Sequence, residues 1–382
     1  MSLVRYKFGE LFRFLPKSKI QAGKGESVGQ YKFFTSSSAQ KKWINEALYD
    51  LEGLIFGTGG SASVHYAYEK FSTSTDCFVA ELVKKNEVST RFVYHFLKFN
   101  IDLLERGFKG AGLKHISKHY IEDIQIPLPP LEEQKRIAAI IDEANEVKRK
   151  RELAIDKLDD LVKSVFHDTF VSLHINKSVW DESTIEFCAN DEKGAVRTGP
   201  FGSDLLHSEF TNKGVAVLGI DNAVNNYFSW SKLRYINLEK YEQLKRYTVK
   251  PSDVLITIMG TCGKCAVVPE DIGPAINTKH LCCITLNQEK CLPTFLHSYF
   301  LMHPVARQYL LQTAKGAIMN GLNMRIIKDM PILLPPIFLQ TQYDCFTKKI
   351  QIEKLKQNNS LLAHIDLLNS IQHQAFTTGF TS

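Results

Sequence analysis

The chain has 382 residues, of which 44% are hydrophobic and 23% are charged. This composition allows sizeable buried cores and excludes a largely disordered protein, and the length fits two or three domains of roughly 150 residues each. The net charge of +6 permits an acidic partner such as nucleic acid without requiring one. No apolar run predicts a membrane span, and residues 1–16 lack the continuous apolar core of a signal peptide. We therefore expect a cytoplasmic protein.

The eight cysteines raise the question of a metal site. Cys262-Gly-Lys-Cys265, followed by Cys282-Cys283, has the spacing of some zinc sites. However, residues 280–286 have the composition of a buried strand, in which adjacent side chains point to opposite faces. Because the two adjacent thiols would then not converge on one ion, we expect free cysteines in apolar cores and no metal site.

The first third of the chain predicts a domain that mixes strands and helix. Residues 31–35, 54–56 and 78–80 are rich in β-branched and aromatic side chains and are therefore predicted strands. A helical stretch is predicted over residues 90–104.

A long helix is predicted to follow this domain. The apolar run 124–128 precedes Pro129-Pro130, and prolines end an extended run and are tolerated at the start of a helix. Glu132 and Glu133 in the first turn complement the helix dipole. The helix is expected over residues 131–166, which corresponds to roughly 54 Å. No small globular core hides a helix of that length.

Apolar residues recur at heptad spacing along this predicted helix. One line consists of Ile137, Ala144, Leu158 and Val165, and a second of Ile140, Val147, Ala154 and Leu161. Arg151 is the single break in the first line. Such spacing over four heptads predicts a coiled-coil partner.

The second half of the chain repeats the plan. Strands are predicted over residues 214–220, 254–258 and 281–286, and a helical stretch over residues 294–312. Residues 109–170 align without a gap with residues 315–376, at a constant offset of 206.

This repeat predicts a second long helix over about residues 337–375, after Pro335-Pro336, with Gln340 in the position of Gln134. Two repeat-related helices most simply pack on each other. We therefore predict an α+β fold, in which two pseudo-twofold-related domains are separated by two long helices packed as an antiparallel coiled coil. The expected bounds are 1–128 for the first domain, 129–170 for its helix, 171–334 for the second domain and 335–382 for its helix.

Several motifs occur in the same order in both halves. They are Ile126-Pro-Leu-Pro-Pro-Leu-Glu-Glu-Gln-Lys-Arg-Ile137 with its weaker copy Leu334-Pro-Pro-Ile-Phe-Leu-Gln340, the segments Arg197-Thr-Gly-Pro-Phe-Gly-Ser203 and Gly260-Thr-Cys-Gly-Lys264, and Gly57-Thr-Gly-Gly-Ser-Ala-Ser63 with Phe71-Ser-Thr-Ser-Thr75. In this order the chain resembles a specificity subunit of a type I restriction–modification system.

The resemblance implies a non-catalytic, sequence-specific DNA-recognition subunit. Each domain would act as a target-recognition domain for one half of a bipartite double-stranded DNA site. The helices would set the spacer and dock two methyltransferase (modification) subunits, and motor–nuclease (restriction) subunits would join for cleavage. S-adenosylmethionine is expected on the methyltransferase partner, so this chain would carry no cofactor. In agreement, Gly260-Thr-Cys-Gly-Lys264 lacks the spacing of a phosphate-binding loop.

Candidate DNA contacts lie in glycine-rich and basic loops. Backbone N–H groups in such loops can approach phosphates, and arginine is the commonest specific reader of guanine. The candidates are Thr58, Ser61, Lys109 and Lys114 in the first half, and Arg197, Ser203, Thr261, Lys264, Lys315, Asn320, Asn323 and Arg325 in the second. Plain tight turns are the alternative interpretation of the glycine-rich loops.

Two other classes of protein remain as alternatives. A coiled-coil scaffold that binds only proteins would show no salt-dependent DNA binding, whereas a DNA reader loses affinity steeply as salt rises. A stand-alone nuclease or methyltransferase would need catalytic carboxylates or a cofactor loop, and the sequence presents neither constellation.

Overall fold

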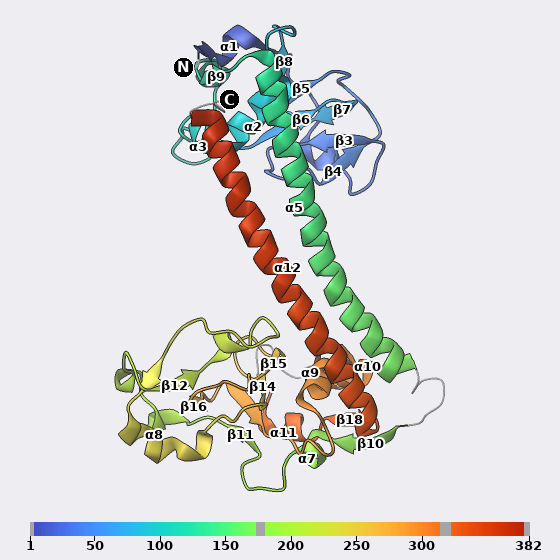
Figure 1. Ribbon diagram of the computed structural model, residues 1–382, viewed down its shortest axis with the longest axis vertical. Helices are drawn as coiled ribbons and strands as arrows, with labels where there is room; N and C mark the ends of the chain where they lie inside the picture. Colours follow the sequence, from blue (N-terminus) through green and yellow to red (C-terminus); the bar gives the residue numbers. More distant parts are fainter. Residues whose placement is uncertain (1–3, 173–179, 314–321, 378–382) are drawn as a thin grey trace. The chain divides into compact units, whose positions relative to one another are not determined.

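The computed structural model describes residues 4–172, 180–313 and 322–377. The chain separates into two compact units. The first unit comprises Met1–Leu153 and Asn358–Ser382, and the second comprises Ala154–Gln357. Two long helices, α5 (Leu131–Phe166) and α12 (Ile337–Thr377), each contribute one part to each unit (Figure 1). Each unit therefore combines one globular domain with parts of both helices.

The first domain contains two main sheets. A four-stranded sheet has the order β2-β8-β5-β6, a three-stranded sheet the order β4-β3-β7, and β1 pairs with β9. The strands are β1 (Val4–Lys7), β2 (Phe12–Phe14), β3 (Tyr31–Phe34), β4 (Lys42–Ile44), β5 (Gly53–Gly57), β6 (Val64–Ala67), β7 (Phe71–Thr73), β8 (Cys77–Leu82) and β9 (Gln125–Leu128). The helices are α1 (Phe8–Leu11), α2 (Thr90–Phe99), α3 (Ile101–Glu105) and α4 (Lys118–Glu122).

The second domain repeats this topology. Its sheets have the orders β11-β17-β14-β15, β13-β12-β16 and β10-β18, and β12 runs parallel to β16 as β3 does to β7. The strands are β10 (Asp181–Thr184), β11 (Val196–Thr198), β12 (Val215–Leu218), β13 (Tyr235–Ile236), β14 (Val254–Thr257), β15 (Cys265–Val267), β16 (Ala275–Asn277), β17 (Leu281–Ile284) and β18 (Pro331–Leu334). The helices are α7 (Ile185–Cys188), α8 (Leu238–Leu244), α9 (Pro293–Met302), α10 (Pro304–Thr313) and α11 (Met324–Lys328). The internal repeat thus extends over both globular domains.

Both long helices contribute to the core of each domain. In the first unit, Ile137 from the start of α5 and Phe376 from the end of α12 are buried with Phe92 of α2. In the second unit, Tyr343 from the start of α12 and Phe170, just beyond the end of α5, are buried with Phe295 of α9 in the same way. Phe170 and Phe376 are related by the repeat offset of 206. Each helix therefore begins on its own domain and ends in the core of the other domain.

A buried glutamine fixes the first turn of α5 to its domain. The Gln134 side chain is 1% exposed, donates to the carbonyl oxygens of Glu87 (3.1 Å) and Pro129 (2.8 Å), and accepts from the Ser89 N–H (2.8 Å). Ser89 in turn caps α2, because its hydroxyl accepts from the Phe92 N–H. One amide therefore joins the start of α5 to the start of α2.

The second unit contains the same arrangement. Gln340, which is fully buried, donates to the carbonyl oxygens of Lys290 (3.1 Å) and Pro335 (2.9 Å) and accepts from the Leu292 N–H (2.8 Å). We call these two arrangements the glutamine clamps. Their equivalence explains why a glutamine follows the two prolines at the same distance in both repeats.

The two helices pack antiparallel, as predicted. In the first unit His364 lies 2.7 Å from the Ala144 carbonyl oxygen, and Arg151 donates to the hydroxyl of Ser360, so positions rise along one helix as they fall along the other. In the second unit Lys354 pairs with Asp159. The predicted fold class, with two related α/β domains and an antiparallel helix pair, is confirmed.

The predicted contact lines of α5 are half correct. The line through Ile137, Ala144, Arg151, Leu158 and Val165 is at least partly buried along its whole length. The second buried line is Ile141, Lys148, Ile155 and Val162, one residue further along than predicted, whereas Ala154 and Leu161 are exposed. Each residue of the second buried line therefore lies four residues after a residue of the first line, and not three. The sequence could not decide between them because both lines contain apolar residues.

The cysteines occupy the positions expected of core residues. Cys282 lies in the core cluster that contains Phe295, and Cys283 lies in a separate cluster with Leu255. Adjacent thiols therefore point to opposite faces of β17. In the described parts of the chain all eight cysteines are free, and Cys262 and Cys345 are exposed.

The glutamine clamp makes a testable prediction for stability. Gln340→Ala leaves one N–H and two carbonyl groups, buried or partly buried, without their partner, so we expect the free energy of unfolding to fall by about 3 kcal/mol. The matched control is Gln342→Ala, two residues further along α12 and exposed, which should change it by less than about 0.5 kcal/mol. Urea unfolding measures both variants, and equal effects would show that the clamp does not stabilise the unit.

Candidate DNA interface

Each domain presents a glycine-containing hairpin loop at the same place. In the first domain the loop joins β5 to β6, and the Gly57 N–H donates to the Ser63 carbonyl oxygen (3.2 Å). In the second domain it joins β14 to β15, and the Thr257 N–H donates to the Lys264 carbonyl oxygen (2.9 Å). Both tips contain a glycine in the left-handed region, Gly60 with φ +83° and Gly260 with φ +72°. A side chain there would strain the turn.

In the first domain, this loop contacts the basic loop 109–115. Thr58 is buried, and its hydroxyl and N–H both donate to the Asp76 carbonyl oxygen. The Thr58 carbonyl oxygen accepts from the Ile116 N–H (3.3 Å) and lies 3.0 Å from His115 Nδ1. We therefore assign Thr58 the role of fixing the two loops together; its own side chain is not free to contact DNA.

The other predicted contacts of the first domain are on the surface. Ser61, Lys109 and Lys114 are exposed, and paired hydrogen bonds between Lys109 and His115 close the loop that carries Lys114. Figure 1 shows the labelled strands β5 and β6 that these loops adjoin. The structure brings these three residues to neighbouring loops, as a phosphate contact requires.

Two lysines that were not predicted from the sequence lie over the ring of Phe78. The ammonium groups of Lys17 and Lys118 both lie over the ring of Phe78, at 4.6 Å and 5.4 Å from its centroid. Their positions in the sequence gave no signal, because they lie 61 and 40 residues from the phenylalanine that brings them together. They add positive charge to this part of the first domain.

In the second domain, the predicted residues Thr261 and Ser203 are exposed, and Lys264 is partly exposed. The segment that carries Ser203 lies directly against the turn after β16, since a Cβ atom at Gly199 would be 2.0 Å from the Asn277 carbonyl oxygen. The Ile258 N–H donates to the His280 carbonyl oxygen (2.9 Å), so the hairpin loop adjoins the turn that carries His280.

Arg197 does not fit its predicted role as a DNA contact. Its guanidinium donates to Asp253 Oδ2 (2.6 Å), to the Thr285 hydroxyl (2.9 Å) and to the carbonyl oxygens of Thr248 and Gly194. The side chain is 9% exposed and that of Asp253 is 1% exposed. Because a DNA contact would require this group to leave a buried ion pair, we correct the prediction and assign Arg197 to the internal support of the domain.

Two of the remaining predicted contacts, Asn323 and Arg325, lie at the start of α11. The Asn323 side chain accepts from the Ile326 N–H (2.9 Å) and caps α11, as Ser117 caps α4 in the equivalent position. Arg325 is 90% exposed and lies 3.4 Å from Asp329. Lys315 and Asn320 lie outside the described residues. Both described residues are exposed, but the Asn323 side chain is used by the helix cap.

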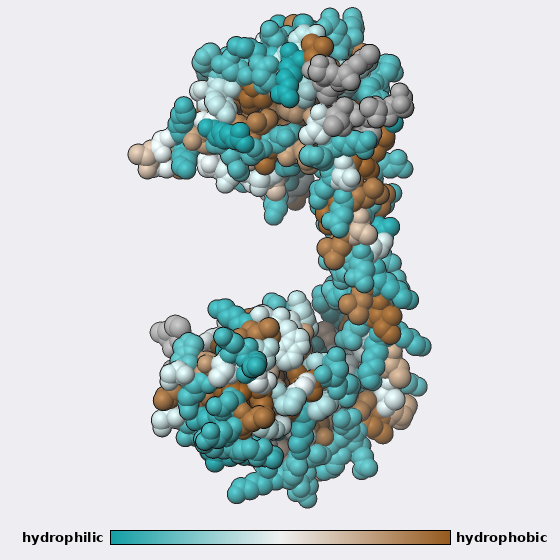
Figure 2. All heavy atoms as spheres, turned by 60° about the vertical axis from the view of Figure 1, so that its left-hand side comes forward, coloured by the Kyte–Doolittle hydropathy of each residue, from teal (hydrophilic) through white to brown (hydrophobic). Residues whose placement is uncertain are grey.

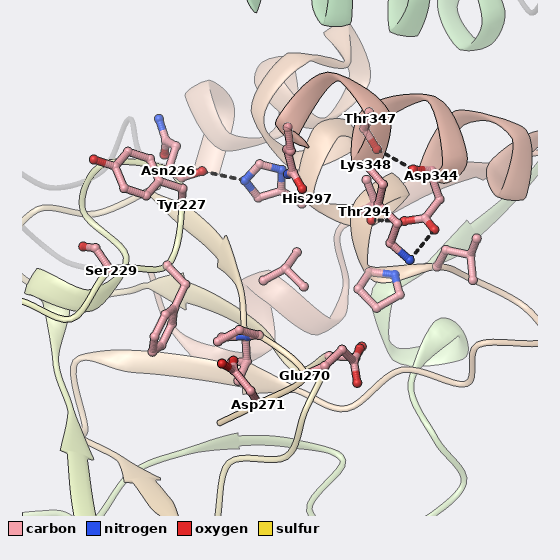
Figure 3. A pocket seen from close by; sticks show the side chains of 18 of the residues that line it. Asn226, Tyr227, Ser229, Glu270, Asp271, Thr294, His297, Asp344, Thr347 and Lys348 are labelled. Atoms are coloured by element: carbon pink, nitrogen blue, oxygen red, sulfur yellow. Dashed lines mark hydrogen bonds and ion pairs between the residues drawn. The ribbon is translucent and has the colours of Figure 1, made fainter. Parts of the chain in front are cut away.

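A pocket of about 660 Å³ lies in the second unit, between the loop 226–230, the start of α9 and the first turns of α12 (Figure 3). Its wall includes Glu270, Asp271 and Asp344; Asp344 accepts from Thr294 and lies 2.8 Å from Lys348. His297 points to the Asn226 carbonyl oxygen at 2.8 Å, and burial lowers the pKa of His297. The carboxylates would repel a phosphate backbone, so we do not assign this pocket to DNA.

Two further features bear on the class of protein. Among residues 4–172, 180–313 and 322–377, no three or more His, Cys, Asp and Glu side chains are grouped so as to hold a metal ion. Within the same ranges, none of the helices is both long enough and apolar enough to cross a membrane.

The fold defines a tandem protein of two related mixed domains, each completed by a pair of long helices.

Comparison with known proteins identifies the family. The family model described as "Type I restriction modification DNA specificity domain" matches residues 4–155 and 202–363. The chain therefore belongs to the family of type I restriction–modification DNA specificity proteins.

Individual relatives agree with this assignment. The chain is 26% identical over 334 residues to the type I restriction enzyme EcoBI specificity subunit of Escherichia coli, covering 78% of this chain and 68% of that protein. It is 25% identical over 299 residues to the MjaVIII specificity subunit of Methanocaldococcus jannaschii, covering 74% and 67%. The crystal structure of a type I restriction–modification S subunit from M. genitalium has the same fold, with a TM-score of 0.65, 14% identity and coverage of 98% and 96%.

The internal role of Arg197 makes a prediction that separates stability from DNA binding. Arg197→Ala leaves Asp253 buried without its partner, so we expect the free energy of unfolding to fall by about 3–5 kcal/mol. Arg246→Ala, at a side chain that is 70% exposed, is the control and should change it by less than about 0.5 kcal/mol. Unfolding and DNA binding should be measured on both. Weakened DNA binding by a stably folded Arg197→Ala variant would restore Arg197 as a contact.

Proposed function

We propose that this chain is the DNA-recognition subunit of a type I restriction–modification enzyme, in which each unit reads one half of a bipartite double-stranded site. The observation that carries the proposal is the repetition of one domain topology, with one glutamine clamp and one glycine-containing hairpin loop in each copy. The family membership supports DNA specificity. A scaffold that binds only proteins would not account for a glycine-containing hairpin loop beside exposed or partly exposed lysine side chains in each domain.

The two copies differ where a reader of two different half-sites would differ. The strands and clamps are equivalent, but the turn beside the hairpin loop carries Asp76 in the first domain and His280 in the second. Because the strands and backbone hydrogen bonds are equivalent, the two loops can have the same geometry. Their side chains can still differ and so contact different bases. We infer that the two half-sites differ in sequence.

The long helices offer a surface for partner subunits. Several apolar side chains of both helices are exposed. On α12 they are Ile352 and Leu355 in the second unit and Leu362 and Leu367 in the first; on α5 they are Leu161 in the second unit and Leu153 in the first. In Figure 2, brown hydrophobic residues interrupt the teal surface along the helices. Apolar side chains exposed on the outside of a helix are suited to bind another protein.

We propose two methyltransferase subunits as the occupants of this surface, one for each half of the pseudo-twofold arrangement, with motor–nuclease subunits joining for cleavage. S-adenosylmethionine would bind the methyltransferase, and this chain would supply the sequence preference. The helix pair would set the number of base pairs between the half-sites.

A domain exchange tests the modular reading of DNA. Residues 1–128 are replaced by the equivalent segment of a relative that keeps an aromatic residue at the position of Phe92, so that the contact with Phe376 is retained. The hybrid is co-expressed with the methyltransferase subunit, and methylated adenines are mapped across the genome. We expect one half of the methylated sequence to change and the other half to stay. A change in both halves, or no methylated bipartite sequence with the original chain, would contradict the proposed function.

Substitutions on the helices test the docking surface. Leu355→Glu and Leu362→Glu place charges on side chains that are already more than 60% exposed, so the chain should remain folded. We expect co-purification with the methyltransferase to fall at least tenfold, because a buried unpaired charge is costly at an interface. Lys349→Glu, also exposed on α12, is the control and should bind normally. Undiminished binding by the double variant would show that the partner docks elsewhere.

A further inference from the structure

One arginine of the second domain is held in a fixed position at the surface. Arg234 directly precedes β13 and lies opposite Val217 of β12, whose N–H donates to the Arg234 carbonyl oxygen (2.8 Å). Its Nη2 donates to Asp221 Oδ1 (2.6 Å), and its Nε donates to the Val217 carbonyl oxygen (3.4 Å). The side chain is 25% exposed. The side chain is therefore oriented by the protein and is still partly exposed.

Asp221 is itself held in place. Its Oδ2 accepts from the Ser231 hydroxyl (2.7 Å) and the Lys232 N–H (3.2 Å). Burial alone would raise the pKa of Asp221, but the hydrogen bonds from Arg234 and Ser231 lower it, so the carboxylate is ionised. Gly219 makes room for the pair, because a Cβ atom there would lie 2.5 Å from Arg234 Nη2.

The hydrogen bonds of Arg234 leave one edge of the guanidinium for an outside acceptor. In the described part of the chain, its bonds use Nε and one N–H of Nη2. Both N–H groups of Nη1 and the second N–H of Nη2 therefore remain. Two adjacent N–H donors in one plane match the O6 and N7 acceptors of guanine in the major groove. An arginine that is already oriented also loses less conformational entropy on binding.

The segment that holds Arg234 in place lies beside the candidate DNA-contacting loop of the second domain. Ile220, next to Asp221, approaches the tip of the hairpin loop, since a Cβ atom at Gly260 would lie 3.1 Å from Ile220 Cδ1. Burial lowers the pKa of His280, and the nearby charges of Lys279 and Arg234 lower it further. Arg234 therefore shares this part of the domain with two other basic groups and with Thr261.

The first domain offers an internal comparison. Lys42 occupies the equivalent position, because it lies opposite Phe33 of β3 as Arg234 lies opposite Val217 of β12. Its ammonium group donates to the carbonyl oxygen of Ala22 (2.8 Å) and not to a carboxylate. The oriented arginine is thus a feature of the second domain and not of the shared frame.

We propose that Arg234 reads a guanine in the half-site recognised by the second unit, and that Asp221 acts as its positioning residue. This inference rests on the proposed function. It assigns to Arg234 the contact that the sequence motif had suggested for Arg197.

The test compares methylated sequences. The full chain and its variants Arg234→Ala, Arg234→Lys, Asp221→Asn and Lys42→Ala are each co-expressed with the methyltransferase subunit in a host without other adenine methylation. Methylated adenines are then mapped across the genome, and thermal unfolding checks that each variant is folded. Arg234→Lys keeps the charge and the stem but loses the paired donors, so it decides the matter if Arg234→Ala does not fold.

We expect the preference for guanine at one position of one half-site to fall roughly 5- to 140-fold in both Arg234 variants, the range for a bidentate contact. Asp221→Asn should weaken the same position less, and Lys42→Ala should leave the sequence unchanged. An unchanged methylated sequence in a folded Arg234 variant would overturn the inference. Lower methylation at every site, without a change of sequence, would also overturn it, because that result indicates a phosphate contact. If the original chain gives no bipartite sequence, the proposed function itself fails, which is a separate result.

Discussion

Each unit depends on the hydrogen bonds of one buried glutamine amide. A long helix that leaves a domain can point in many directions unless its first turn is fixed. Gln134 and Gln340 supply this fixation through two donor bonds and one acceptor bond to backbone groups on either side of the helix start. An amide side chain suits this position because it offers both donors and an acceptor in one plane. The two prolines before each helix fix the approaching chain, so the clamp acts on a segment with little freedom.

The ends of the helices make the two domains depend on each other. Phe376 packs against Phe92 and Phe96 in the first domain, and Phe170 packs against Phe295 and Tyr343 in the second. Neither core is complete without the final turns of a helix that starts in the other unit. Between these ends the contact positions of the helix pair combine polar and apolar side chains: Arg151 bonds to Ser360 and His364 to the Ala144 carbonyl oxygen, while Ile155 and Leu158 are partly buried.

The sequence predicted the fold because its signals were local and repeated. The Pro-Pro pairs, the glutamines and the strand-like runs lie within short segments, and α5 begins and ends at the predicted residues 131 and 166. The candidate site was harder to predict. Arg197 looked like a surface arginine in a motif, because its partner Asp253 lies 56 residues away. The pair of Arg234 and Asp221 belongs to no motif, and the need for Gly219 beside it is visible only in three dimensions.

The two domains show how one frame can hold different recognition surfaces. Four backbone hydrogen bonds define the equivalent loops, two in each domain: Gly57 to Ser63 and Thr58 to Asp76, then Thr257 to Lys264 and Ile258 to His280. None of these bonds depends on the identity of the side chain, so the side chains at these bonded positions can change without loss of the bonds. The carboxylate of Asp76 and the imidazole of His280 are one such difference. The glutamines and the core phenylalanines cannot vary in this way, because their side chains make the contacts. The residues that hold the loops are thus separate from the residues that the loops present, which is the property that a protein with two independent DNA-reading halves requires.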